Sequence, residues 1–338
     1  MQHEIVKSAA LLDKNGNIAE PGWARSLISR YSRADIKAHP LRIKEWDYYL
    51  ISNDRFALAL TIADNGYMGL ISASVLDFEK PWEQTTSVMT AFPMGKYKLP
   101  ETSAAGVTSY TDSRVNMRFE AANGVRHISC VFHKFLRDET LEAELTLTDE
   151  PQHSMVIATP FEKPKAFYYN QKINCMRSDG FMRLGGKTYD FSKKDSFATL
   201  DWGRGVWTYD NTWYWGNGNG TVNGHRVGFN IGYGFGDTSA ASENMIIYDG
   251  MAHKLSKVNF NIPADSYIKP WTFTSDDGRF EMDFVPVIDR AARTNALIIE
   301  SDQHQVFGRF TGKMVLDGGE IIELKDFMGF AEKVHNRY

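Results

Sequence analysis

The chain has 338 residues, of which 43% are hydrophobic and 24% charged, and its formal net charge is -4 at pH 7. This composition is that of a folded globular protein with a sizeable core, and it excludes a disordered chain. Charges of both signs are interspersed, without the basic block that would neutralise nucleic-acid phosphates. Aromatic residues reach 13%, which favours β-structure because aromatic side chains suit half-buried pleated surfaces.

No apolar run in the sequence has the form of a targeting or membrane segment. Charged residues such as Lys7 and Asp13 interrupt the first stretch, and no segment approaches the roughly 18 apolar residues that cross a bilayer. Cys130 and Cys175 lack a CxxC spacing, which favours two buried free thiols over a disulfide or a metal site. We therefore expect a cytoplasmic protein without a transmembrane segment.

Helical signals are few, and short helices are expected only within residues 21–33 and 81–89. The segment Arg42–Tyr49 (RIKEWDYY) lies between them and is interpreted as a first strand. Because successive side chains of a strand point to opposite faces, this segment presents two sets of side chains, with Lys44, Trp46 and Tyr48 on one face and Glu45, Asp47 and Tyr49 on the other.

Hairpin turns are indicated by dipeptides that end in glycine and adopt positive φ angles at low steric cost. They occur at Asn65-Gly66, Asn123-Gly124, Asn223-Gly224, Asp277-Gly278 and Gly318-Gly319. Flanking segments such as 115–120 and 141–148 alternate apolar and polar residues, which predicts strands with one buried face. Many short strands joined by hairpins predict an antiparallel barrel or sandwich, and the lack of strand–helix alternation argues against a Rossmann or TIM-barrel fold.

Residues 168–174 (YYNQKIN) combine aromatic and polar side chains. Two tyrosines, two asparagines, a glutamine and a lysine supply hydrogen-bond donors and acceptors beside aromatic surface, a mixture that small-ligand sites use. Tyr168, Tyr169 and Lys172 are therefore candidate ligand contacts. A polar strand edge at an exposed rim would have a similar composition.

A polar, turn-rich stretch near residues 185–200 separates two halves of the chain, each about the size of a small β-barrel domain. We expect an N-terminal extension at residues 1–40, a first β-domain at 41–190 and a second β-domain at 191–338.

The stretch 201–220 (DWGRGVWTYDNTWYWGNGNG) holds four of the chain's 8 tryptophans. Trp207, Trp213 and Trp215 suit either a packed sheet or the wall of a cavity, where indole rings stack on a ligand. Asp210 is expected to lie in a turn between two strands, and for that reason it is not a candidate for chemistry.

Asp201 is the first candidate acid. Desolvation among aromatic rings would raise the pKa of its carboxyl and keep it protonated, as acid-catalysed hydration or isomerisation of a double bond requires. Arg204 would favour the carboxylate if it were close. In a regular strand the two side chains point to opposite faces, unless the glycines beside Arg204 form a bulge. A structural ion pair in an aromatic core is the alternative.

Glu243 is the second candidate acid, because it follows a loop of small residues and enters a strand; a solvated acid at a strand end is the alternative. The glycine-rich segment 232–236 (GYGFG) has no helix after it, so a strand or a bulge is favoured over a nucleotide loop. The 9 histidines are scattered without the spacing of a metal site, and no metal or cofactor is expected.

Five stretches of the sequence resemble a bacterial protein family, the domain of unknown function 2804 family: RIKEWDYY, TPFEKPKAFYYNQKINCM, LDWGRGVWTYDNTWYWGNGNG, FNIGYGFGDTSAASENM and GFAEKVHNRY. That family is similar to the lipocalin-like superfamily of carotenoid 1,2-hydratases, AttH-type proteins and fungal pericyclase-like enzymes. The resemblance implies an all-β fold of two consecutive lipocalin-like (calycin) antiparallel β-barrels with a ligand cavity. In the hydratases an aspartate is thought to protonate a terminal alkene, and the resemblance implies this role for Asp201.

Our leading hypothesis is a small-molecule protein with an aromatic-lined cavity, acting as a hydratase, isomerase or cyclase on a hydrophobic or part-apolar substrate. Asp201 would be the acid, Arg204 would orient an anionic or carbonyl group, and Tyr169 and Lys172 would supply polar contacts. One alternative is a non-catalytic protein that binds a lipid or another hydrophobic ligand. A second is a carbohydrate-active enzyme, in which Asp201 and Glu243 would face one open cleft.

Overall fold

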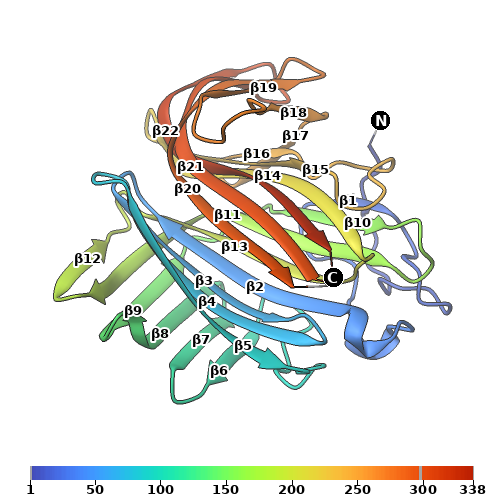
Figure 1. Cartoon of the computed structure of the whole chain (residues 1–338). Coiled ribbons are helices and arrows are strands. Elements are labelled where there is room, and N and C mark those ends of the chain that lie inside the picture. Colours follow the sequence, from blue (N-terminus) through green and yellow to red (C-terminus); the bar gives the residue numbers. More distant parts are fainter. Residues whose placement is uncertain (1, 297–298, 338) are drawn as a thin grey trace.

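Residues 2–296 and 299–337 form two antiparallel β-sheets in the computed structural model (Figure 1). The first sheet contains β1 (Gly22–Ala24), β2 (Ile43–Ser52), β3 (Phe56–Asp64), β4 (Met68–Asp77), β5 (Trp82–Ala91), β6 (Gly106–Thr111), β7 (Val115–Ala122), β8 (Val125–Leu136), β9 (Glu139–Thr148), β10 (Met155–Pro160), β11 (Phe167–Leu184), β12 (Lys187–Phe191) and β13 (Phe197–Val206). The second contains β14 (Asp210–Val222), β15 (His225–Tyr233), β16 (Met245–Tyr248), β17 (Met251–Lys254), β18 (Val258–Asn261), β19 (Trp271–Ser275), β20 (Phe280–Ala296), β21 (Ile299–Val315) and β22 (Ile321–Arg337). Two 3₁₀ helices, η1 (Arg33–Asp35) and η2 (Pro40–Arg42), precede β2.

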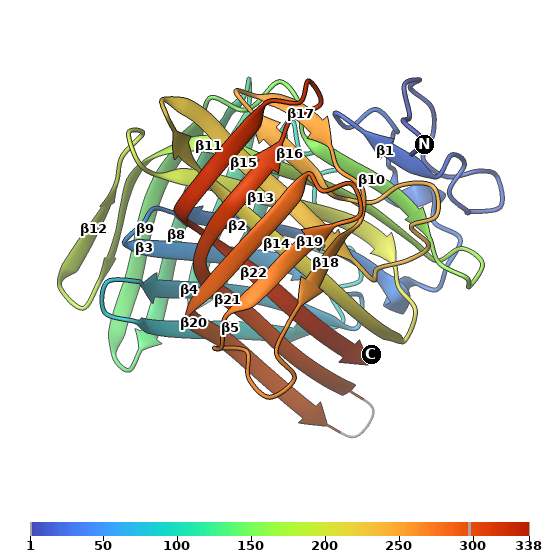
Figure 2. The ribbon, with the colours of Figure 1, turned by 90° about the horizontal axis from the view of Figure 1, so that it is seen from above.

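Each sheet curls around its own hydrophobic core. The main path of the first sheet runs β5-β4-β3-β2-β13-β11-β9-β8-β7-β6, and that of the second runs β17-β16-β15-β14-β22-β21-β20-β19-β18. Figures 1 and 2 show the long strands of the second sheet crossing over β2, β11 and β13 of the first. This tandem lipocalin-like architecture confirms the all-β fold class predicted from the sequence.

Hairpin turns lie where the glycine dipeptides predict them. Asn123-Gly124 joins β7 to β8, and Asn223-Gly224 joins β14 to β15. Both residues of each pair have positive φ, at 52° and 73° in the first turn and 52° and 87° in the second. These angles are those of the turns that match the twist of two-residue hairpins.

The sequence predicted two short helices, and both predictions are wrong. Residues 22–24 form β1, and Trp82–Ala91 form β5, which pairs with β4 along its whole length. The β-branched side chains of Thr85, Thr86 and Val88 suit this pleated surface, and the ladder to β4 outweighs the local helical preference. No helix in the described part of the chain is long and apolar enough to cross a membrane.

The chain passes from the first sheet to the second between β13 and β14. This point lies further along the chain than residue 190, after which the polar stretch indicated a division. β13 pairs with β2 and β11, and therefore belongs to the first sheet. Asp210, expected in a turn, is instead the first residue of β14 and pairs with Arg337. The polar stretch contains the hairpin between β11 and β12 and the loop before β13, so turn density alone did not locate the change of sheet. The division of the chain into domains stays a prediction.

In the WGNGNG segment of β14, asparagines and glycines alternate and therefore lie on opposite faces of the strand. Asn217 and Asn219 point to the first sheet and hydrogen-bond to its side chains. Gly218 and Gly220 point to the core of the second sheet, where a Cβ on Gly218 would lie 2.7 Å from the ring of Phe229. The asparagines therefore bind the two sheets together, and the glycines leave room for aromatic rings.

Candidate functional site

β13 carries Asp201 and Arg204 on opposite faces. Asp201 is in register with Lys172 of β11 and Tyr48 of β2, and its side chain faces the second sheet. Arg204 points into the core of the first sheet and is completely buried. The pairing of β13 with β2 runs without a bulge, so the separation expected of a regular strand is the one observed. Arg204 is therefore not placed to orient a group held by Asp201.

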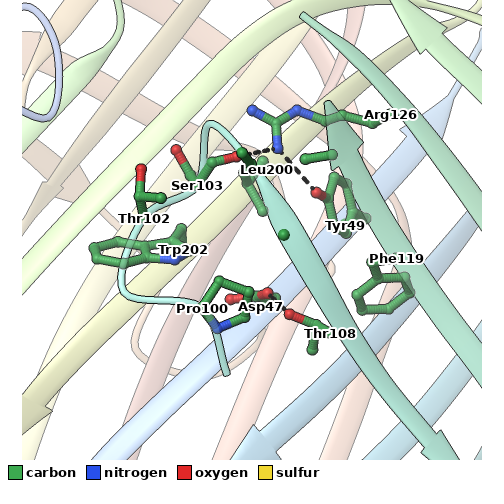
Figure 3. A pocket seen from close by; sticks show the side chains of 13 residues that line it. Asp47, Tyr49, Pro100, Thr102, Ser103, Thr108, Phe119, Arg126, Leu200 and Trp202 are labelled. Carbon is green, nitrogen blue, oxygen red and sulfur yellow. Dashed lines mark hydrogen bonds between the residues drawn. The ribbon is translucent and has the colours of Figure 1, made fainter. Parts of the chain in front are cut away.

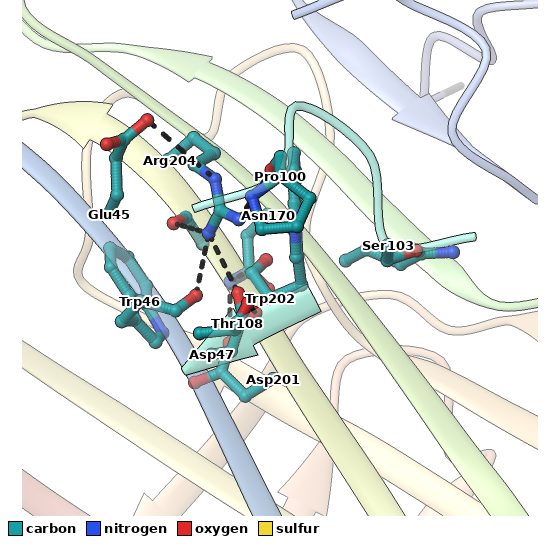
Figure 4. Close-up of polar contacts among 12 residues, drawn as sticks. Glu45, Trp46, Asp47, Pro100, Ser103, Thr108, Asn170, Asp201, Trp202 and Arg204 are labelled. Carbon is teal, nitrogen blue, oxygen red and sulfur yellow. Dashed lines mark hydrogen bonds and ion pairs between the residues drawn. The ribbon is translucent and has the colours of Figure 1, made fainter. Parts of the chain in front are cut away.

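Arg204 belongs to a buried ion network inside the first sheet (Figure 4). Its Nη1 donates to Asp47 Oδ1 at 3.0 Å and to the carbonyl oxygen of Trp46 at 2.8 Å. Its Nη2 donates to the carbonyl oxygen of Pro100 at 2.7 Å, and its Nε lies 3.9 Å from Glu45 Oε1. These contacts tie β2, β13 and the loop before β6 together, which is a structural role.

One cavity in the first core measures about 10 Å³, the space of one water molecule. Figure 3 shows most of the residues that line it, which are Asp47, Tyr49, Pro100, Thr102, Ser103, Ala105, Gly106, Thr108, Phe119, Ala121, Arg126, Leu200 and Trp202. Tyr169 is buried in the same core, where its hydroxyl donates to the carbonyl oxygen of Ser29 at 2.8 Å. The cavity of about 10 Å³ is too small for the ligand that the lipocalin resemblance implies.

A buried ionic group lies in the inter-sheet layer, the side chains between the facing surfaces of the two sheets. Lys172 Nζ is 2.7 Å from Asp201 Oδ1, which also accepts a hydrogen bond from Asn170 Nδ2 at 2.6 Å. The ammonium lies 3.9 Å from the ring centre of Trp215, in a cation–π contact. Asp201 therefore has an ammonium and an amide as partners in this layer, and its role as an acid stays a prediction.

Glu243 reaches this layer from the loop before β16. Its carboxyl carbon lies against β15, 3.0 Å from the position that a Cβ on Gly232 would occupy. Burial raises the pKa of Glu243, and the negative charge of Asp201 reinforces the rise while the Lys172 ammonium opposes it. The neutral carboxylic acid is therefore favoured at Glu243 more than at an exposed glutamate.

Glu332, on β22, is a further carboxyl of the ionic group, which consists of Lys172, Asp201, Glu243 and Glu332. Trp213 Nε1 donates to Glu332 Oε1 at 3.0 Å, and Gln305 Nε2 donates to Oε2 at 2.8 Å. Burial raises the pKa of Glu332 although both hydrogen bonds lower it. Desolvation is therefore the largest influence on the pKa of Glu243 and of Glu332, two of the three carboxyls in the group.

An aromatic cluster adjoins the ionic group and consists of Trp46, Tyr168, Trp207, Trp213 and Phe235. The ring centre of Phe235 lies 4.8 Å from those of Tyr168 and Trp207, and 5.2 Å from that of Trp213. Tyr168 stacks on Trp46 at 6.2 Å. Burial raises the pKa of Tyr168 well above its ordinary value, so its phenol is neutral.

An open cleft of about 710 Å³ borders this cluster on its outer side. It is lined by Phe161, Glu162, Thr208, Asp210, Asn211, Thr212, Gly234, Gly236 and Asp237. These residues neighbour the cluster in sequence, since 208–212 connects Trp207 to Trp213 and two glycines flank Phe235. Trp213 contacts Phe235 and also donates to Glu332, so a single aromatic side chain spans the distance from the cluster to the ionic group.

The structure brings most of the residues selected from the sequence into one layer: Tyr168, Lys172, Asp201, Trp207, Trp213, Trp215 and Glu243. Tyr169 and Arg204 lie in the first core instead. Asn170, Phe235 and Glu332 also belong to the site, although none of them was among the residues selected from the sequence. The only available signals were the glycines around Phe235 and a carboxyl within the apolar run of β22.

Among the described residues, no group of three or more His, Cys, Asp or Glu side chains is arranged to hold a metal ion. Cys130 and Cys175 are both buried and free, which confirms the prediction of two buried thiols. Burial raises the pKa of each thiol to about 12, so neither is a ready nucleophile.

Two curled antiparallel sheets that face each other across a polar and aromatic layer define a tandem lipocalin-like protein. The family model described as "Domain of unknown function (DUF2804)" matches residues 2–338, and the chain belongs to this family.

Two solved structures are similar in fold. One is an AttH-type protein of Nitrosomonas europaea, with 11% identity and a TM-score of 0.52 over 90% of this chain and 96% of that one. The other is CghA, solved with Sch210972, with 11% identity and a TM-score of 0.53 over 97% of both chains. Comparison with curated protein sequences finds no match. At this identity the likeness extends to the fold alone.

Proposed function

We propose that this protein is an acid catalyst of the hydratase, isomerase or cyclase type, acting on a hydrophobic or part-apolar small molecule in the inter-sheet layer. The observation that carries the proposal is the burial of three carboxyls and one ammonium beside an aromatic cluster that borders an open cleft. Buried carboxyls whose pKa is raised retain their protons at higher pH, which is what a general acid requires.

Glu243 takes the role of the acid in this proposal, in place of Asp201. In a hydration, the O–H bond of Glu243 breaks and a C–H bond forms on the alkene, leaving a carbocation next to the indole rings. Water then supplies the oxygen of the new C–O bond, and its released proton returns to the carboxylate of Glu243. In an isomerisation, the cation instead loses a proton from a neighbouring carbon to the carboxylate of Glu243. In a cyclisation, a second C=C π bond attacks the cation to form the C–C bond, and the new cation then loses a proton to the same carboxylate.

Lys172, Asp201 and the indoles are assigned supporting roles. The Lys172 ammonium lies 2.7 Å from a carboxyl oxygen of Asp201, and a carboxylate held in a fixed position stabilises a cation that forms nearby. The ring faces of Trp213 and Trp215 add cation–π stabilisation. CghA, which shares the fold, was solved with Sch210972, and this supports a ligand site in the present protein. A cytoplasmic location stays a prediction.

A non-catalytic binder of a hydrophobic ligand would use the same layer without the proton donor. A carbohydrate-active enzyme receives less support, because it requires Asp201 and Glu243 to face an open cleft, whereas they are 7% and 9% exposed.

The proposal is tested by incubating the protein in D₂O with a panel of prenyl alcohols and α,β-unsaturated carbonyl compounds. Carbon-bound deuterium or the addition of water is detected by mass spectrometry of the extract. For any compound that reacts, E243Q is expected to lose most of the turnover, while R204K retains it. Turnover by E243Q equal to that of the native protein would exclude Glu243 as the acid. A compound bound stoichiometrically and recovered unchanged would favour the binder.

A further inference from the structure

Phe235 separates the open cleft from the interior of the inter-sheet layer. Its side chain is buried, with 6% of the residue exposed, although its chain neighbours Gly234 and Gly236 line the cleft. Its ring touches Phe161 at the cleft and Tyr168 inside the layer, with centre distances of 5.2 Å and 4.8 Å. The ring therefore stands between the two spaces.

Close packing and a hydrogen bond hold the backbone on the C-terminal side of Phe235. Gly234 and Gly236 have φ angles of 92° and 78°. A Cβ on Gly236 would lie 2.6 Å from Thr159 Cγ2, so only glycine allows this close approach. The amide of Asp237 donates to the carbonyl oxygen of Pro160 at 2.7 Å and anchors the turn.

The inner contacts of Phe235 lead directly to the ionic group. Trp213, whose ring centre lies 5.2 Å from that of Phe235, donates to Glu332 at 3.0 Å. Burial raises the pKa of the Tyr168 phenol, and the negative charge of Glu243 adds to the rise, so the two side chains lie near each other. A ligand that displaced the Phe235 ring would consequently lie against the aromatic cluster and within reach of the carboxyls behind it.

The rim of the cleft is acidic. Three of its residues, Glu162, Asp210 and Asp237, carry carboxylates. Asp210 is partnered by His335 and Arg337 at 3.4 Å each, whereas the ion pairs formed within residues 2–296 and 299–337 include neither Glu162 nor Asp237. A negative rim lowers the local concentration of anionic molecules and favours uncharged or cationic ones.

We propose that Phe235 is the specificity-determining gate of the inter-sheet site, and that the molecule it admits from the cleft is an uncharged or cationic, part-apolar one. The size of the residue at position 235 sets how far such a molecule penetrates between the sheets. This inference rests on the proposed function for the identity of the inner site, but access through Phe235 does not depend on any chemistry there.

The test compares F235A and F235L with F78A. Phe78 is a matched control because it is 7% exposed and packs in the same inter-sheet layer, where its ring contacts Phe307. Binding is measured with Nile red, an uncharged apolar dye, and access to the tryptophans with acrylamide, an uncharged quencher. Urea unfolding of each variant shows that it is folded under the conditions of the assay.

Removing the Phe235 ring leaves a cavity that adjoins the cleft, so F235A is expected to bind Nile red at least about five-fold more tightly than the native protein. F235L is expected to fall between them, and F78A to match the native protein. Acrylamide quenching should rise most in F235A, less in F235L and not in F78A. Equal dye binding by F235A and the native protein, or an equal gain in F78A, would overturn the gate. Neither dye binding nor quenching depends on turnover. A result that excludes Glu243 as the acid is therefore distinguishable from a result that excludes Phe235 as the gate.

Discussion

Replacing Lys172 with methionine tests whether the ion pair with Asp201 stabilises the contact between the sheets. The ammonium lies 2.7 Å from the carboxylate oxygen, and the two side chains are 4% and 10% exposed, so solvent screens the pair little. At an effective dielectric constant of about 20, the gross attraction at this distance is about 6 kcal/mol. Asn170 continues to donate to Asp201 in K172M, and the expected net loss is the roughly 3–5 kcal/mol typical of a buried charge left without its partner.

The assay is urea unfolding followed by tryptophan fluorescence, for K172M, D201N and the double variant. The double variant should be more stable than the sum of the single losses by about 0.5–3 kcal/mol, because it leaves no unpaired charge. K269M is the surface control, since Lys269 and Asp265 are 57% and 67% exposed, and its loss should stay below about 1 kcal/mol. A loss in K172M no larger than that in K269M would refute the reasoning.

The remaining predictions concern the first core, the pH dependence and the packing of β14. R204M should lose roughly 3–5 kcal/mol because it leaves the buried Asp47 carboxylate without its ion-pair partner, yet Nile red binding should match that of the native protein; a change in dye binding would argue against a purely structural role. Burial raises the pKa of Glu332 above its ordinary 4.5, so its contribution to stability is complete below that pH and is lost as the pH rises through the raised value. E332Q should therefore gain stability relative to the native protein as urea titrations move from about pH 4 to about pH 8, and a constant difference would contradict the shift. G218V should cost about 1–3 kcal/mol by overpacking against Phe229, measured beside G318V, whose side chain meets open space; equal losses would count against the packing argument.

Local sequence patterns predicted the strands whose partners follow them directly in the chain. The period-two alternation of β7 and β9 and the two Asn-Gly turns are local, because a hairpin needs only a turn and two matched faces. The faces of β2 were also predicted correctly, with Trp46 and Tyr48 toward the second sheet and Asp47 toward the first core. β5 was missed because its pairing with β4, rather than local preference, decides its conformation.

The composition of the candidate site was less predictable, because long-range register decides it. Lys172 meets Asp201 only through the pairing of β11 with β13, and Glu332 reaches the layer only through the pairing of β14 with β22. Neither register can be deduced from turn dipeptides. The alternation of side chains along a strand predicts that Arg204 and Asp201 lie on opposite faces. The partners of Arg204 on β2 were not predictable in this way, because they lie more than 150 positions away in the sequence.

The asparagine contacts of β14 bear on whether either half of the chain can exist alone. Asn219 accepts from Asn174 and donates to Thr199, and Thr199 donates in turn to Asn217, so amide and hydroxyl groups of both sheets satisfy one another. Severing the chain after residue 207 would leave these groups and the indole of Trp215 exposed to water on a surface prone to aggregation. A gene fragment encoding only one sheet should therefore yield an insoluble product, whereas two fragments made together should reassemble. If evolution exchanged one half of the chain for an unrelated sequence, all of these hydrogen-bonding side chains would have to be replaced at the same time.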